Sequence, residues 1–204
     1  MLPTALLSIV IAPVGAGFIS GGNANDPSDP IGQLSGQTVR RLTLGKPLSP
    51  GGGSPSGFYD MDLMLRLTAT DKVAVGPNVL LRLRDGSAIQ AQAGMDNQGH
   101  VSVSGGSITG RFDNQLSAEL SVGGGSFQVH GDLRNAFCNG QGCQAGGGSV
   151  QVADQAGLLV DGSVLNTGRF AVDSGGRLSA RSFSQTAGQL TVDGTLDTFG
   201  GDVV

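Results

Sequence analysis

Three aspartates recur at nearly regular intervals in the C-terminal half of the chain. Asp154, Asp173 and Asp193 each follow a short run that alternates apolar and polar residues. If these runs stack, the three carboxylates lie near one another at a single corner. Glycosidases use paired carboxylates, and a hard cation such as Ca²⁺ relieves the repulsion between them. Asp-Ser-Gly at 173–175 and Asp-Gly at 193–194 are also turn sequences, so turn formation is the favoured interpretation. The aspartates are a candidate metal or sugar site, and we predict no catalytic residue and no resident metal.

A histidine occupies the corresponding place in an earlier repeat. His130 is followed by Gly131 and Asp132, and the other histidine, His100, lies beside Gly99. No Gly-x-Ser-x-Gly sequence lies between a strand and a helix, as a nucleophile elbow requires. We therefore predict no catalytic role for His130.

The two cysteines, Cys138 and Cys143, flank a short loop that contains Gly140 and Gly142. A local disulfide is the simplest interpretation, and free thiols or metal ligation are the alternatives. No second cluster of Cys or His supplies the remaining metal ligands. A disulfide is typical of an exported protein.

Four similar segments indicate a repeat: Gly-Ser-Phe-Gln-Val at 125–129, Gly-Ser-Val-Gln-Val at 148–152, Gly-Arg-Phe-Ala-Val at 168–172 and Gly-Gln-Leu-Thr-Val at 188–192. Their first apolar residues are 23, 20 and 20 residues apart. Leu158 and Leu178 share the 20-residue period, and Ile89 and Ile108 extend it backwards in steps of 19. Such a period, with no room for a helix between strands, predicts an all-β fold built as a parallel β-solenoid.

Four regions follow from the sequence. Residues 1–25 carry no charge and contain an apolar run at 6–11; they are a signal-like leader, an apolar β segment or a lipid anchor, and the run is too short to span a membrane. Residues 26–55 form a Pro/Gly-rich linker, and residues 56–86 an N-terminal β capping region. Residues 87–204 form about six coils, which stop without a cap. An open C-terminal edge predicts homo-association.

The net charge of −4 and the pI near 4.9 disfavour nucleic acid and anionic lipid as partners. Binding to phosphate groups needs clustered Lys and Arg, and the chain has no such cluster.

The segment from Gly168 to Leu196, with Gly-Arg-Phe-Ala-Val-Asp-Ser-Gly-Gly-Arg-Leu followed by Gly-Gln-Leu-Thr-Val-Asp-Gly-Thr-Leu, resembles the β-helix repeats of filamentous-haemagglutinin and autotransporter passenger proteins. The resemblance covers residues 100–204. It implies a right-handed β-helix on a bacterial surface, used for adhesion or as a stalk.

The expected function is therefore a secreted or cell-surface structural and adhesive module that has no catalytic activity and no cofactor. It would bind carbohydrate or protein through a flat face. The main alternative is a polysaccharide-degrading β-helix enzyme that uses Asp154, Asp173 and Asp193, with Ca²⁺ as an option. A third is an intracellular polymerising solenoid, for which reduced cysteines would be the sign.

Overall fold

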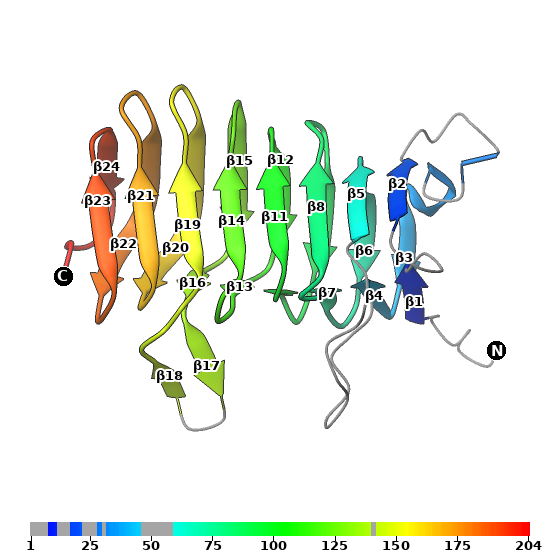
Figure 1. The fold of residues 1–204 in the computed structure, drawn as a ribbon, viewed down its shortest axis with the longest axis horizontal. Helices are drawn as coiled ribbons and strands as arrows, with labels where there is room; N and C mark the ends of the chain where they lie inside the picture. The colour runs from blue at the N-terminus through cyan, green and yellow to red at the C-terminus, as the bar shows by residue number, and fades with distance from the viewer. Residues whose placement is uncertain (1–7, 12–16, 22–27, 30–31, 46–58, 140–141) are drawn as a thin grey trace.

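The structure, a computed structural model, describes residues 8–11, 17–21, 28–29, 32–45, 59–139 and 142–204. Short strands stack in parallel along a rod, with residues 8–11 near one end and residues 195–198 near the other (Figure 1). The chain makes about seven turns, each through three strands. The predicted all-β parallel β-solenoid is thus confirmed. Among the described residues the one helical element is the 3₁₀ turn η1 (Gly32–Leu34).

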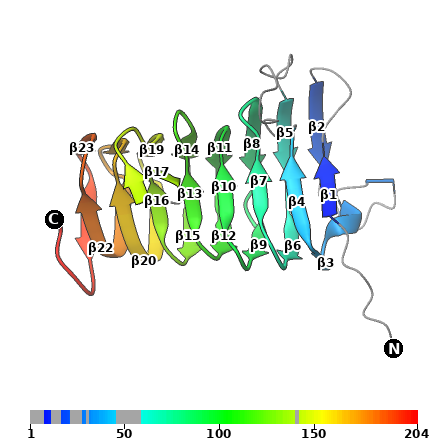
Figure 2. The same ribbon diagram turned by 90° about the horizontal axis from the view of Figure 1, so that it is seen from below.

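Three strand-lined faces run along the rod (Figures 1 and 2). Face 2 consists of β2 (Gly17–Gly21), β5 (Tyr59–Leu63), β8 (Val79–Leu83), β11 (His100–Val103), β14 (Glu119–Val122), β19 (Ser149–Val152), β21 (Arg169–Val172) and β23 (Gln189–Val192). Face 1 consists of β1 (Ser8–Ile11), β4 (Arg41–Leu44), β7 (Val73–Val75), β10 (Met95–Asn97), β13 (Phe112–Asn114), β16 (Leu133–Asn135) and the second halves of β20 (Gly157–Asn166) and β22 (Arg177–Gln185). Face 3 consists of β3 (Gln37–Val39), β6 (Arg66–Ala69), β9 (Ala88–Ala91), β12 (Gly106–Thr109), β15 (Ser126–His130), the first halves of β20 and β22, and β24 (Thr195–Thr198).

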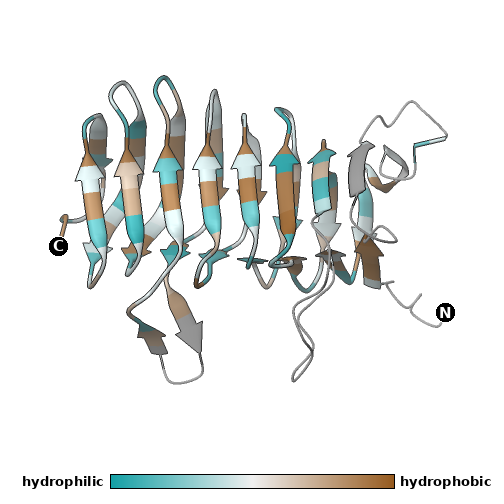
Figure 3. Ribbon diagram, viewed as in Figure 1, coloured by the Kyte–Doolittle hydropathy of each residue, from teal (hydrophilic) through white to brown (hydrophobic). Residues whose placement is uncertain are grey.

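Rows of aliphatic side chains fill the interior from coil to coil. On face 2, Met61 lies opposite Leu81, Leu81 opposite Val101 and Val101 opposite Leu120, and all four are fully buried. Figure 3 shows the alternation of apolar and polar residues along the strands of this face. Full burial of such a side chain contributes about 1.5–3 kcal/mol. Because each coil covers its neighbours, the core needs few aromatic residues.

A row of amides interrupts the apolar interior at the ends of the face 1 strands. Asn97, Asn114, Asn135 and Asn166 are fully buried, and the Nδ2 of each of the first three donates to the Oδ1 of the next at 2.6–2.8 Å. Asn166 Nδ2 donates to Gln185 Oε1 at 2.6 Å. We call these five residues the amide ladder. The ladder satisfies buried polar groups that would otherwise each cost about 1–3 kcal/mol.

The register confirms part of the predicted repeat. Val150 lies opposite Phe170, and Phe170 opposite Leu190, on face 2. Leu158 lies opposite Leu178 on face 3.

The segment 125–129 was predicted to be a fourth copy of the face 2 strand, and this assignment is wrong. The segment lies mostly in β15 on face 3, where Phe127 faces Leu158. The face 2 residue opposite Val150 is Leu120, 30 residues earlier. The step is long because this coil also contains a hairpin of β17 (Phe137–Asn139) and β18 (Gly142–Gln144). Strands on different faces alternate in the same way, so the sequence pattern did not separate them.

The backward trace of the repeat is correct at one step and shifted at the other. Ile89 lies opposite Ile108 on face 3, as predicted. Ile108 then faces Val129 rather than Phe127, which lies opposite Gly106.

The predicted capping region, 56–86, consists of solenoid strands over its described part. Strands β5, β6, β7 and β8 each pair in parallel with a strand of the coil before and a strand of the coil after. The predicted linker likewise contributes β3 and β4, and the predicted leader contributes β1 and β2. Residues 1–7, 12–16 and 22–25 of that leader lie outside the described residues.

Candidate functional site

The structure does not bring the three aspartates into one group. Asp173 and Asp193 directly follow the paired residues Val172 and Val192, but Asp154 lies one position further along its turn. Asp173 Oδ2 accepts a hydrogen bond from Gln151 Nε2 at 2.8 Å. The described residues contain no group of three His, Cys, Asp or Glu side chains arranged to hold a metal ion.

The position of Asp154 fits turn formation. Its Oδ1 occupies the space that a Cβ at residue 175 would need, and the backbone of Gly175 has a φ of +80°. A side chain at that position would be strained and would collide with the carboxylate. Asp154 and Gly175 therefore pack together as parts of successive turns.

His130 pairs with a carboxylate of the next coil. Its Nδ1 lies 2.7 Å from Asp161 Oδ2, and Gln128 Nε2 donates to Asp161 Oδ1 at 3.2 Å. The hydrogen bond with His130 lowers the pKa of Asp161, which stays charged as the partner of the imidazole. This is a surface pair on face 3.

The cysteines lie in the hairpin that projects from the rod (Figure 1). The antiparallel register of β17 and β18 sets Cys138 opposite Cys143. Cys143 is disulfide-bonded, and no described cysteine is free. The bond would thus fasten a side excursion and leave the coils themselves without a crosslink.

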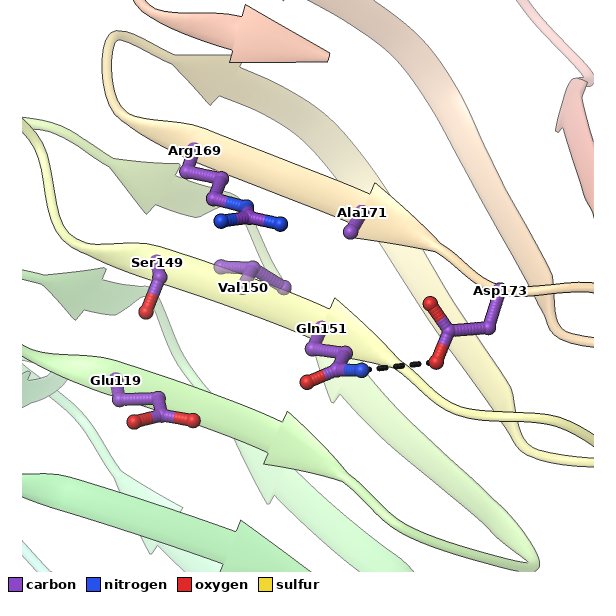
Figure 4. Close-up of a pocket in the computed structure, with 7 residues that line it drawn as sticks. All are labelled: Glu119, Ser149, Val150, Gln151, Arg169, Ala171 and Asp173. Atoms are coloured by element: carbon purple, nitrogen blue, oxygen red, sulfur yellow. Dashed lines mark hydrogen bonds between the residues drawn. The ribbon is translucent and has the colours of Figure 1, made fainter. Parts of the chain in front are cut away.

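A depression on the outer surface of face 2 is the candidate binding site. We call it the face 2 pocket, and its volume is about 240 Å³. It spans three successive strands, β14, β19 and β21, and the turn after β21 (Figure 4). Its lining residues are Glu119, Ser149, Val150, Gln151, Arg169, Ala171 and Asp173.

The strand register sets the geometry of the pocket. Glu119 lies opposite Ser149, and Ser149 opposite Arg169, so the three share one outward row. Adjacent strands are about 4.8 Å apart, which separates the backbones of Glu119 and Arg169 by about 9.6 Å. The small Ser149 between them leaves the hollow seen in Figure 4. In the next row Gln151 lies opposite the small Ala171.

The amide ladder holds the backbone beneath this row. Asn97 Nδ2 donates to the carbonyl oxygen of Glu119 at 2.8 Å, and Asn114 Nδ2 donates to that of Ser149 at 2.9 Å. Asn135 Nδ2 donates to that of Arg169 at 2.9 Å. Each residue of the pocket row is therefore fixed by an interior asparagine, and such support preorganises a binding surface.

Glycines at the corner before the row allow the coils to approach closely. A Cβ at Gly148, Gly168 or Gly188 would collide with a carbonyl oxygen of the coil below, that of Ala118, Gly148 and Gly168 respectively. Only glycine fits where backbones meet in this way. The three stacked glycines each directly precede a face 2 strand, β19, β21 or β23.

The pocket combines opposite charges that do not pair with each other. Arg169 stands at one end of the row and Glu119 at the other, where His100 Nδ1 lies 3.5 Å from Glu119 Oε2. Ser149 and Gln151 add a hydroxyl and an amide. The site thus offers hydrogen-bond donors and acceptors to a polar ligand. The sequence did not reveal it, because its members meet only through the register of three coils.

Comparison with known proteins gave no match among protein-family models, curated proteins or solved structures. Within the described part of the chain, no helix is long and apolar enough to cross a membrane.

Proposed function

We propose that this chain is a structural and adhesive module of the cell surface or extracellular space, which binds carbohydrate along face 2 and leaves it chemically unchanged. The observation that carries the proposal is the face 2 pocket, a preorganised polar hollow on the side of a stiff rod. Sugars are rich in hydroxyl groups, which both donate and accept hydrogen bonds. The pocket offers complementary groups within one hollow.

The composition of the surface predicts weak binding at each site. The chain has no Trp, and its one tyrosine, Tyr59, is buried in the core. Neither Trp nor Tyr is therefore exposed to stack on a sugar ring. Binding then relies on hydrogen bonds whose net contributions are about 0.5–1.5 kcal/mol each. Strength would come from many contacts along a polymer or between many copies of the rod.

Two observations support the location. Cys143 is disulfide-bonded, and disulfides persist mainly in oxidising compartments. The repeat at Gly168 to Leu196 resembles those of surface-exposed passenger proteins. Alkylation of the chain in its native cells, followed by mass spectrometry, tests this. Protection of Cys143 until a reductant is added supports export, and a freely alkylated thiol favours the intracellular polymerising alternative.

No observation on the described residues supports the enzymatic alternative. It required Asp154, Asp173 and Asp193 to converge in a groove, and the described residues show Asp154 packed in a turn and Asp173 bonded to Gln151. Incubation with acidic and neutral polysaccharides, followed by size-exclusion chromatography, separates the two functions. An enzyme would be established if wild type shortens a polymer and the variant in which asparagine replaces the three aspartates does not.

A matched pair of substitutions tests adhesion by face 2. Ser149→Trp fills the pocket, and Ser107→Trp places the same bulk at a half-buried outward serine of face 3. Affinity electrophoresis in gels that contain polysaccharide measures binding. We expect retardation of wild type and of Ser107→Trp, and none for Ser149→Trp. Equal retardation of all three proteins would refute face 2 as the binding surface.

A further inference from the structure

We propose that the face 2 pocket selects sugars that carry a carboxylate group, and that Arg169 determines this specificity. The inference rests on the proposed function, because it names the ligand class of the same pocket. It follows from the way arginines are paired elsewhere on the rod.

Three arginines of faces 2 and 3 pair with an acidic residue one coil away. On face 2, Arg82 pairs with Asp60 and Arg84 with Asp62. On face 3, Arg177 Nη2 lies 2.7 Å from Asp197 Oδ2. Each partner is on the neighbouring strand, about 4.8 Å away, which is within reach of an arginine side chain.

Arg169 has no such acidic partner among the described residues, and the same is true of Arg134 and Arg181 on other strands. Its neighbours in the outward row are Ser149 in the coil before and Gln189 in the coil after, and neither carries a charge. Its guanidinium makes no ion pair or hydrogen bond with any described residue. Glu119 is two strands away, and Ser149 is too short to bridge the interval. A cation thus stands unneutralised at one end of the pocket.

The guanidinium presents a planar array of N–H donors that matches a carboxylate in two parallel hydrogen bonds. Two carboxylates lie at other places in the pocket: Glu119 is two strands away across the stack, and Asp173 lies further along the same coil as Arg169 (Figure 4). These accept hydrogen bonds and repel a second anion, so they favour hydroxyl groups. A sugar unit that bears a carboxylate as well as hydroxyls can pair with Arg169 and donate hydrogen bonds to the acidic groups.

Other ligand classes fit less well. A small inorganic anion pairs with Arg169 but makes no contact with Glu119 or Asp173, and a neutral sugar leaves the charge of Arg169 unmatched. An amino sugar can pair with Glu119 or Asp173 but also leaves the charge of Arg169 unmatched. A uronic acid unit within a polysaccharide supplies a carboxylate for Arg169 and hydroxyl donors for Glu119 and Asp173.

The test uses two polymers with the same backbone, polygalacturonate and its fully methyl-esterified form. The esterified polymer keeps the sugar ring and lacks the carboxylate charge. Binding to the full chain is measured by isothermal titration calorimetry on wild type, Arg169→Gln and the control Arg181→Gln. Arg181 is an exposed arginine on β22, so the control makes the same change in net charge away from the pocket.

We expect wild type and Arg181→Gln to bind polygalacturonate at least tenfold more tightly than the ester, since a charge-assisted pair is lost with esterification. Arg169→Gln should bind both polymers alike, and added salt should weaken only the charged complex of the other two proteins. Equal affinity of wild type for the two polymers, or an unchanged preference in Arg169→Gln, would overturn the specificity and leave carbohydrate adhesion standing. Binding of neither polymer, with no retardation in any polysaccharide gel, would overturn both proposals.

Discussion

Replacing Asn135 by alanine tests whether the amide ladder stabilises the rod. The Asn135 side chain is fully buried and takes part in four hydrogen bonds. Its Nδ2 donates to Asn166 Oδ1 at 2.6 Å, to the Gly148 oxygen at 3.1 Å and to the Arg169 oxygen at 2.9 Å. Its Oδ1 accepts from Asn114 Nδ2 at 2.8 Å.

The expected loss follows from this count. The two N–H groups of the amide share three acceptors, so the side chain makes about three full hydrogen bonds. At about 1 kcal/mol net for each, Asn135→Ala lowers the free energy of unfolding by about 3 kcal/mol. Such a value is near the upper end for a single substitution. Thr109→Ala, at an exposed outward position of face 3, is the control and should change stability by less than about 0.5 kcal/mol.

Urea denaturation followed by far-ultraviolet circular dichroism measures both variants, since the chain has no Trp to report by fluorescence. The denaturant dependence should stay the same, so that a shift of the midpoint reports stability. A loss below about 1 kcal/mol for Asn135→Ala, with the β spectrum intact, would refute the reasoning. The ladder would then fill space without adding net stability.

Asn135→Asp provides an independent readout with almost the same shape. A carboxylate has no N–H for the three oxygen acceptors, and burial raises its pKa above that of the unfolded chain. The variant therefore loses stability as pH rises above about 4, and recovers part of it on acidification. Asn135→Ala should show no such recovery.

Three further substitutions are informative in the same assay. Tyr59→Phe should raise the unfolding free energy by up to about 1 kcal/mol, because the buried Tyr59 hydroxyl has no hydrogen-bond partner among the described residues; a loss would contradict this. Burial raises the pKa of Asp113 despite its contact with Arg111, so Asp113→Asn should gain stability over wild type as pH rises from about 4 to 7. The hydrogen bond from Arg84 lowers the pKa of Asp62, so Asp62→Asn should cost at most about 1 kcal/mol at pH 7, and nothing once acid has protonated the wild-type carboxyl.

The solenoid was predictable because its signals are local. Alternation of apolar residues marks each strand, and the 20-residue step between Val150, Phe170 and Leu190 marks the stacking. The same locality explains the wrong assignment of 125–129, because a face 3 strand alternates like a face 2 strand. The predicted cap at 56–86 is wrong because its described strands belong to regular coils, in which the spacing between corresponding apolar residues is less uniform.

The amide ladder and the pocket were not predictable in this way. Successive ladder residues are separated by 17, 21, 31 and 19 positions, and a lone asparagine after a short strand is read as a turn residue. The pocket depends on Ser149 lying between Glu119 and Arg169, which requires the register across a hairpin. Once the register is known, Arg169 is seen to lie between Ser149 and Gln189, neither of which is charged.

The hairpin of β17 and β18 shows that the number of residues in a coil does not determine how far the coil advances along the axis of the rod. The coil that contains it uses 30 residues where the next uses 20, yet β14 and β19 still pair residue by residue. Each coil advances the axis by one backbone spacing, about 4.8 Å, however many residues it contains. A longer insertion at this corner, even a whole folded domain, would therefore leave the height of every later coil unchanged.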